Sequence, residues 1–142
     1  MVAKQLSVFI ENRQGRLGEV LNVLKNNNVN ILSLSLADTT EYGLLRLIVN
    51  NPELGKAKLA EEGFSTLLSD VLVIRIKHVS GSLQELIVKL SENDINVEYM
   101  YGLSTDGEQA FVVLKASCVE KAQMVLEQNG VCTLSTEEIA KL

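Results

Sequence analysis

The segment "ENRQGRLGEVL", residues 11–21, places an amide, a glycine and two arginines where an alternating apolar stretch gives way to a helical pattern. Gly15 at this junction can adopt a positive φ and lets another group approach the backbone closely. The helix that follows presents unpaired N–H groups and the positive end of its dipole, which suits a carboxylate or phosphate. These residues therefore predict an anion-binding junction, although a tight turn alone also explains a single glycine.

The polar side chains around Gly15 are compatible with a ligand that carries both charges. Asn12 offers an amide that donates and accepts, which suits an ammonium and a carboxylate together, but it is also a common turn residue. Arg13 and Arg16 lie at a helix start, the end where the dipole disfavours cations. They attract an anionic ligand or are simply solvated, and solvation is the simpler interpretation.

The junction occurs a second time, 66 residues later, as "KHVSGSLQELI" at residues 77–87. Gly81 takes the place of Gly15, and His78, the single histidine, takes the place of Asn12. Histidine also donates and accepts near neutrality, although a lone histidine without acidic or thiol partners is more often structural than catalytic. The two arginines have no counterparts in the second copy, so the two junctions need not bind alike.

The same shift aligns the elements on both sides of the junction. Residues 6–10 and 72–76 alternate apolar and polar with a period of two, which predicts a half-buried strand. Residues 17–24 and 83–90 are apolar at helical spacing, which predicts an amphipathic helix. Each copy therefore opens with a strand followed by a helix.

A second strand opens with "VNIL" at residues 29–32 in one copy and "INVE" at residues 95–98 in the other. Asn30 and Asn96 align at this point, where asparagine is depleted in strands. Two asparagines at matched positions suggest a binding role, although a turn or edge position explains either one.

The remainder of each copy predicts a hairpin, a second helix and a last strand. Polar turns at residues 37–43 and 104–109 lead into third strands. The segment 64–76 is expected to hold two strands, separated after Ser69 and Asp70. Further signals are helix starts at Asn51–Pro52, Ser117 with Glu120 and Ser135 with Glu138, and left-handed helix ends at Gly63 and Gly130.

The predicted fold class is α+β, with two ferredoxin-like β-α-β-β-α-β units, residues 1–70 and 71–142, the second ending in a short helix. Right-handed crossovers give each unit an antiparallel sheet with two helices on one face. A unit this small is marginal alone, and its open sheet has edges that need cover. We therefore expect the two units to pack side by side.

Composition limits the function classes. Hydrophobic residues make up 46% of the chain, which allows a packed core, while aromatics make up 4% and the formal net charge is −5. This composition disfavours nucleic acid as a partner, including for a ferredoxin-like RNA binder. No signal peptide or membrane span is apparent, which predicts a cytoplasmic protein. Cys118 and Cys132 are interpreted as reduced, partly buried thiols, and we expect neither metal nor cofactor.

The repeat, with "NRQGRL" at residues 12–17 and "VNI" at 29–31, resembles the ACT domain. This family consists of small regulatory modules that bind amino acids and control enzymes of amino-acid metabolism. The first copy is similar to ACT modules of acetolactate synthase regulatory subunits and of phosphoglycerate dehydrogenase. The second copy carries the weaker matches "HVSGSL" at 78–83 and "INV" at 95–97.

The resemblance implies ligand sites between two neighbouring units, each formed by the first loop of one unit and the second-strand start of the other. One site would combine Asn12, Gly15 and Leu17 with Asn96. The other would combine His78, Gly81 and Leu83 with Asn30.

The function expected from this resemblance is that of a free-standing, non-catalytic amino-acid sensor, because no catalytic domain accompanies the modules. Its partners would be an amino acid, an amino-acid biosynthetic enzyme in trans, and a second copy of the chain in a homodimer. The alternative is a pure interaction or regulatory subunit that dimerises or holds an enzyme without binding a ligand. No catalytic pairing, metal-ligand spacing or phosphate loop supports an enzyme.

Overall fold

The computed structural model describes residues 1–38 and 41–142, so part of the predicted turn at 37–43 lies outside the described residues. The chain divides into two compact units, residues 4–69 and residues 1–3 with 70–142. They are called the N-terminal unit and the C-terminal unit below.

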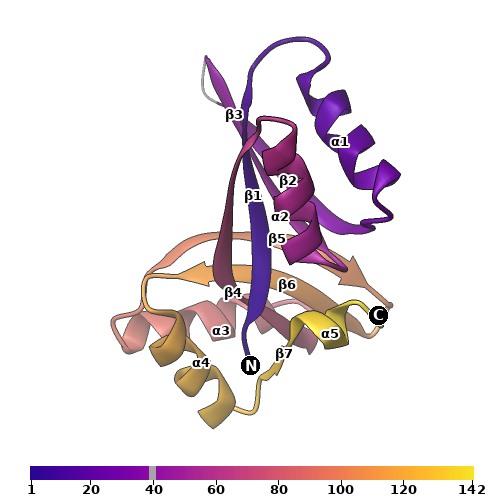
Figure 1. Ribbon diagram of the computed structural model, residues 1–142. Coiled ribbons are helices and arrows are strands. Elements are labelled where there is room, and N and C mark those ends of the chain that lie inside the picture. Colours follow the sequence, from indigo (N-terminus) through magenta and orange to yellow (C-terminus); the bar gives the residue numbers. More distant parts are fainter. Residues whose placement is uncertain (39–40) are drawn as a thin grey trace. The chain divides into compact units, whose positions relative to one another are not determined.

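The described elements follow the predicted order in both units (Figure 1). They are β1 (Ala3–Glu11), α1 (Arg16–Asn26), β2 (Ile31–Asp38), β3 (Tyr42–Val49), α2 (Pro52–Glu61), β4 (Ser65–Lys77), α3 (Ser82–Glu92), β5 (Val97–Thr105), β6 (Gln109–Ala116), α4 (Val119–Gln128), β7 (Cys132–Leu134) and α5 (Thr136–Ile139).

The N-terminal unit has the strand order β2-β3-β1-β4, with β3 antiparallel to both β1 and β2. Opposite pairs such as Leu6 and Leu47 set the register, and α1 and α2 cover one face of the sheet (Figure 1). The core lies between these helices and the sheet and consists of Leu6, Val8, Ile10, Val20, Leu24, Val29, Leu45, Leu47, Val49, Leu59 and Phe64.

The C-terminal unit repeats this arrangement with the order β7-β4-β6-β5. Both β5 and β7 pair antiparallel with their neighbours, and β4 is antiparallel to β6. Its core comprises Leu72, Ile74, Leu86, Leu90, Ile95, Leu114, Ala116, Ala122, Val125 and Leu126. The predicted class, two ferredoxin-like units, is confirmed, whereas their side-by-side packing stays a prediction.

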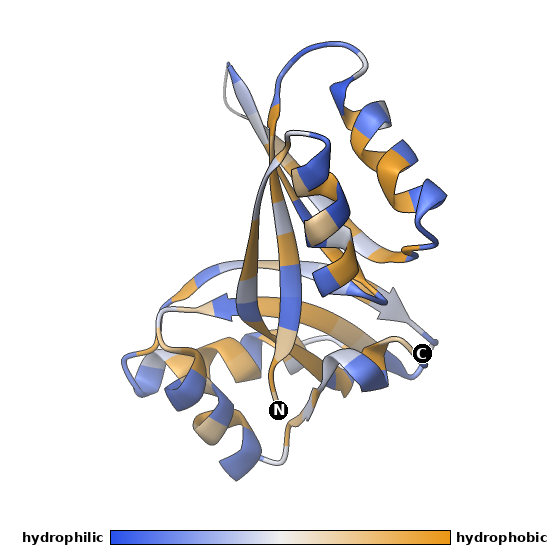
Figure 2. Ribbon diagram, viewed as in Figure 1, coloured by the Kyte–Doolittle hydropathy of each residue, from blue (hydrophilic) through white to orange (hydrophobic). Residues whose placement is uncertain are grey.

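Amphipathic helices hold each unit together. The helices α1 and α3 carry distinct hydrophobic and hydrophilic sides (Figure 2), and their buried residues lie four apart, Val20 with Leu24 and Leu86 with Leu90. Burying an apolar side chain of this size contributes roughly 1.5–3 kcal/mol. The helical periodicity of the sequence therefore correctly predicted which faces of these helices are buried.

The predicted break after Ser69 and Asp70 is wrong. One continuous strand, β4, runs from Ser65 to Lys77 through both residues. Serine and aspartate are only disfavoured in strands, and neither prevents an extended backbone as proline does. The strand continues because it pairs with β1 of the N-terminal unit and, from Leu72 to Lys77, with β6 and β7 of the C-terminal unit.

The helix ends agree with most of the predicted signals. Asn51 caps α2 by accepting from the Leu54 amide, and Ser135 with Glu138 forms the predicted capping box of α5. The helix-ending glycines also have positive φ, 85° at Gly63 and 74° at Gly130.

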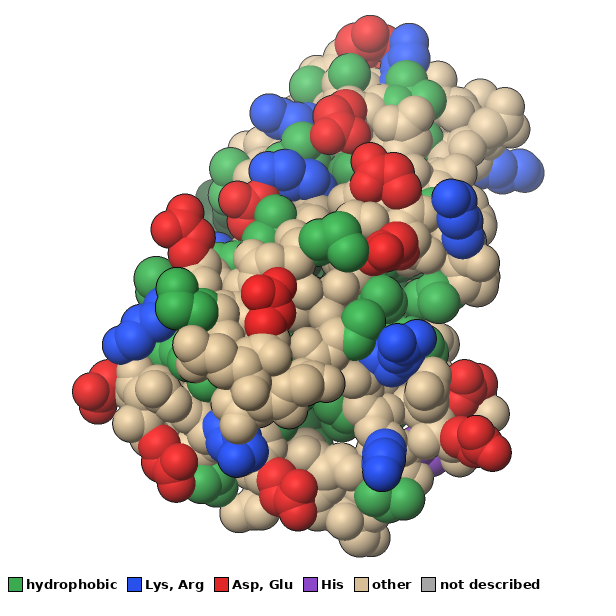
Figure 3. All heavy atoms as spheres, turned by 90° about the horizontal axis from the view of Figure 1, so that it is seen from below, with side chains coloured by type: hydrophobic (Ala, Val, Ile, Leu, Met, Phe, Trp, Pro, Cys, Tyr) green, Lys and Arg blue, Asp and Glu red, His purple; other side chains and the backbone are tan. Residues whose placement is uncertain are grey.

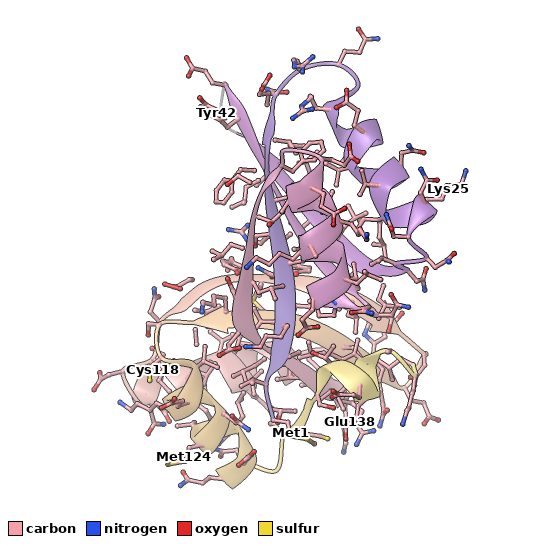
Figure 4. The ribbon with its side chains drawn as sticks, viewed as in Figure 1. Met1, Lys25, Tyr42, Cys118, Met124 and Glu138 are labelled. Carbon is pink, nitrogen blue, oxygen red and sulfur yellow. The ribbon has the colours of Figure 1, made fainter. Side chains whose placement is uncertain are left out.

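The predicted capping box at Ser117 is wrong. The helix α4 starts one residue later, with Cys118 at the cap position, because the Ser117 hydroxyl accepts a hydrogen bond from the Asn96 amide at 3.1 Å instead. Both cysteines are free and exposed, not partly buried as predicted, and Cys118 stands at the start of α4 (Figure 4).

Candidate functional site

The two predicted junctions share one backbone conformation. Gly15 and Gly81 cap α1 and α3 with φ of 89° and 88°. Residues with a side chain rarely adopt this left-handed conformation, so the backbone at both positions favours glycine. A Cβ added at either glycine would meet no atom within 4 Å, so the space above each junction is open.

The first turn of α1 leaves two backbone donors free. The Arg16 amide donates to the Arg13 carbonyl at 3.4 Å and the Glu19 amide to the Gly15 carbonyl at 3.1 Å. The amides of Leu17 and Gly18 have no acceptor among the described residues. Unpaired first-turn amides of this kind are ready donors to an anion.

The first turn of α3 has the same pattern. The Ser82 amide donates to the Val79 carbonyl at 3.3 Å and the Glu85 amide to the Gly81 carbonyl at 3.0 Å. Within the described part of the chain, the Leu83 amide has no acceptor. Both predicted junctions therefore present the same donors.

A cavity of about 300 Å³ lies beside the first junction. Asn12 and Leu17 line it together with Ile10, Leu36 and Gly43. The Asn12 amide nitrogen donates to the Glu41 carbonyl at 3.0 Å, which ties the loop to the start of β3. The structure thus brings Asn12 and Leu17 to one cavity, whereas Gly15 does not line it.

An ion pair stands at the rim of this cavity. Arg13 Nε donates to Glu11 Oε2 at 2.7 Å, and both residues line the cavity. The hydrogen bond from Arg13 lowers the pKa of the Glu11 carboxyl below its usual range, and the charge of Arg13 adds to this effect. Both side chains are exposed, so the pair adds little to stability.

The second junction has a corresponding cavity of about 410 Å³, lined by His78, Lys77, Val79, Gly107 and Glu108 among others. The His78 amide donates to the Glu108 carbonyl at 2.8 Å, as Asn12 does to Glu41. Neither Gly81 nor Leu83 lines this cavity, so His78 is the predicted residue that contributes to it.

The predicted second-strand asparagines lie at the far ends of their units. The Asn30 amide donates to Asn50 Oδ1 at 2.8 Å, just past the end of β3, whereas Asn12 is tied to the residue before its start. The Asn96 amide is held in the same way by Ser117 Oγ at 3.1 Å, past the end of β6. The structure does not bring Asn12 near Asn30, nor His78 near Asn96, within one unit.

Arg16 differs from its predicted solvated state. Its side chain is 18% exposed, pairs with Glu19 and lies over the Phe64 ring, 4.3 Å from the ring centroid. Its Nε is buried without a hydrogen-bond partner within the described residues. The sequence pattern missed this contact because Phe64 follows Arg16 by more than forty residues and no local spacing connects them.

Among residues 1–38 and 41–142, no group of three His, Cys, Asp or Glu side chains is placed to hold a metal ion. No helix in that part of the chain is long and apolar enough to cross a membrane. On the face shown in Figure 3, acidic and basic side chains are interspersed rather than separated by sign.

The repeated junction, the paired units and the fold match one known family over residues 1–142, described as the ACT domain pair. The chain belongs to the ACT domain pair family. A crystal structure of a Bacteroides thetaiotaomicron protein is similar to this ACT domain pair with a TM-score of 0.94 and 37% identity, covering 100% of this chain and 98% of that one. No curated protein matches the chain.

Two further solved structures share the fold of this ACT domain pair. The regulatory subunit of aspartate kinase from Thermus thermophilus has a TM-score of 0.62 and 17% identity, over 88% of this chain and 91% of that one. The corresponding subunit from Thermus flavus has a TM-score of 0.60 and 16% identity, over 88% and 90%. At this identity the likeness concerns the fold.

Proposed function

We propose that this ACT domain pair is a non-catalytic, amino-acid-binding regulatory protein of amino-acid metabolism. Its ligand sites lie between the two units. One is formed by Asn12, Gly15 and Leu17 with Asn96. The second site, in which the two units exchange roles, is formed by His78, Gly81 and Leu83 with Asn30.

The main support for this proposal is that the same strand–helix junction occurs in both units. In each copy a left-handed glycine stands before a helix whose first turn has free amides, next to a side chain that donates and accepts, Asn12 or His78. Free amides and the helix dipole suit a carboxylate, and an amide or imidazole acceptor suits an ammonium group. These are the two charged groups of every amino acid.

The separation of the asparagines supports a site shared between units. Asn12 and Asn30 are tied to Glu41 and Asn50, which flank strand β3, and these two anchoring residues lie roughly 30 Å apart at about 3.3 Å per residue. An amino acid does not span this distance. A site that uses both types of residue therefore needs the second-strand start of another copy of the fold.

Regulation follows if the ligand favours one arrangement of the two units over another. The shift in population is limited by the difference in ligand affinity between the arrangements. The partner that responds would be an amino-acid biosynthetic enzyme or a second copy of the chain. The fold shared with aspartate kinase regulatory subunits supports such a role.

Thermal unfolding in the presence of each of the twenty amino acids tests the proposal. Ligand at about one hundred times its Kd adds roughly 2.7 kcal/mol to stability. Asn96→Ala should weaken the first site and Asn30→Ala the second, without loss of the fold, because the bonds described at these positions involve backbone amides. Asn22→Ala, on the exposed side of α1, is the matched control. If no amino acid raises the Tm, the proposal is wrong.

A second candidate, an interaction subunit without ligand, is favoured by the exposed apolar residues of β2. This strand lies at the edge of its sheet, and Leu34 and Leu36 are 49% and 46% exposed. Exposed apolar edge strands are typical of pairing surfaces. Co-purification of an enzyme that is lost in a Leu34→Lys, Leu36→Lys variant, together with no response to any amino acid, would establish this function instead.

A further inference from the structure

A third cavity, of about 240 Å³, lies within the C-terminal unit and adjoins the second junction cavity, with which it shares Lys77. It is open to the surface and is bordered by the end of β4, one side of α3 and the turn between α4 and β7. Ligand pockets for drug-sized molecules measure about 300–1,000 Å³, so this cavity suits a smaller molecule. Its lining includes Ile76, Ser82, Glu85, Leu86, Lys89 and Val131.

The N-terminal unit fills the equivalent place with its own side chains. The internal repeat aligns Ser82 with Arg16 and Val131 with Phe64. In the N-terminal unit the Arg16 guanidinium lies over the Phe64 ring, 4.3 Å from its centroid. The C-terminal unit thus lacks one cation and one large apolar group at the same position, and the cavity stands there.

The C-terminal unit keeps the carboxylate that pairs with Arg16 in the N-terminal unit. Glu85 aligns with Glu19, the carboxylate that pairs with Arg16. Over the described range, Glu85 makes no side-chain hydrogen bond or ion pair, and it lines the cavity. A cationic group on a ligand can therefore occupy the position that the Arg16 guanidinium takes in the N-terminal unit.

A basic group has been added beside Glu85. Lys89 lines the cavity one helical turn further along α3, where the N-terminal unit has Val23. Residues four apart on a helix lie on one face with Cβ atoms about 5–6 Å apart. The cavity therefore presents one carboxylate and one ammonium group to the same small volume.

The other charged groups around the cavity are basic. Arg75 and Lys77 also line it, although the strand alternation places their side chains on the sheet face opposite to Ile76. With Lys89 beside Glu85 on the same helix face, a ligand that is only cationic is disfavoured. A ligand that also carries a carboxylate satisfies both signs.

We infer that this cavity binds an apolar α-amino acid, with its ammonium group at Glu85, its carboxylate at Lys89 and its side chain against Leu86 and Val131. The ammonium group replaces the Arg16 guanidinium of the N-terminal unit, and the apolar side chain replaces the Phe64 ring. The inference rests on the proposed amino-acid-binding function, but it places this site inside one unit rather than between two.

Calorimetric titration of the full chain with L-leucine tests the inference. Isoamylamine, which lacks the carboxylate, and 4-methylpentanoate, which lacks the amine, should each bind at least about tenfold more weakly, as expected for loss of one charged hydrogen bond. Glu85→Gln should weaken leucine binding by a similar factor. Glu19→Gln, at the equivalent position of the N-terminal unit, is the matched control and should leave the affinity unchanged.

A filling variant provides an independent test. Ser82→Arg with Val131→Phe rebuilds the N-terminal arrangement in the C-terminal unit and should abolish leucine binding at this cavity while the protein stays folded by circular dichroism. Binding that survives both this variant and Glu85→Gln, but is lost in Asn96→Ala, overturns the inference and leaves the proposed function standing. Absence of leucine binding to the wild-type protein also overturns it, and the screen of twenty amino acids then decides on the proposed function separately.

Discussion

The two units have the same backbone but different side chains at the same positions. Both junctions use a glycine with φ near 89° and one amide-to-carbonyl bond that ties the loop to the facing strand. Around this frame, Arg16 packs on Phe64 in the N-terminal unit, whereas Ser82 and Val131 leave a cavity in the C-terminal unit. The repeat therefore preserves the residues that the backbone conformation needs and varies the residues that line the cavity.

The backbone at the start of the second strand is held by different side chains in the two units. The amide of Asn30 is held by Asn50 Oδ1, and the amide of Asn96 by Ser117 Oγ. Each acceptor residue also donates its own amide back to the asparagine carbonyl, at 3.1 Å and 2.8 Å. The start of the second strand is therefore fixed in both units, by an amide oxygen in one and a hydroxyl in the other.

The largest expected effect on stability comes from truncating one equivalent leucine in the core of each unit. Leu59 in α2 and Leu126 in α4 occupy equivalent, almost fully buried positions. Leu59→Ala and Leu126→Ala should each lower the free energy of unfolding by about 2–5 kcal/mol, because each removes buried apolar surface and leaves a cavity. Urea denaturation measures both. Val88→Ala, on the exposed side of α3, is the control, and a cost below about 1 kcal/mol for one leucine would contradict equivalent packing.

The glycines give the next largest effect. Gly15→Ala and Gly81→Ala should each destabilise the protein by roughly 1–2 kcal/mol, because alanine is strained at positive φ although the space around it is open. Gly18→Ala is the internal control: this glycine lies within α1 without positive φ and with no atom within 4 Å, so alanine should stabilise by about 0.5–1 kcal/mol. Thermal unfolding distinguishes the two signs, and equal effects at all three glycines would refute a conformational role.

Much of the fold was predictable because local pattern and global structure agree. The spacing of Val20 and Leu24, and of Leu86 and Leu90, defined the buried helix faces, and the glycines marked the junctions. The strand β4 was mispredicted because polar residues at its centre resemble a turn signal, whereas pairing on both sides keeps it extended. Pairing between strands that are far apart in the sequence cannot be recognised from a local sequence pattern.

The candidate sites were less predictable than the fold. Asn12, before the junction glycine, and Leu17, in the first turn of α1, line one cavity. The packing of Arg16 on Phe64 depends on how α1 and the α2–β4 turn meet in space, which no spacing along the chain reveals. The cavity of the C-terminal unit lies where Arg16 and Phe64 pack in the N-terminal unit. The sequence repeat could therefore indicate its position only after this packing was known from the structure.

The smallest expected effect concerns the rim of the first junction, where Glu11 and Arg13 pair and the C-terminal unit has Lys77 and Val79 instead. Arg13→Gln should raise the pKa of Glu11 toward its usual value of 4.5, because it removes the hydrogen bond and the positive charge that lower it. NMR titration of the carboxyl carbon measures this shift.

The direction of the pH effect at this pair follows from the lowered pKa of Glu11. A carboxyl with a lowered folded-state pKa stabilises the protein above its unfolded-state pKa, and this contribution disappears as the pH falls through the folded-state value. Wild type and Arg13→Gln should therefore differ slightly near neutral pH and converge in acid. Arg13→Lys, which keeps the charge but not the Nε–H donor, should give an intermediate pKa. A Glu11 pKa that is unchanged in both variants would show that the ion pair does not form in solution.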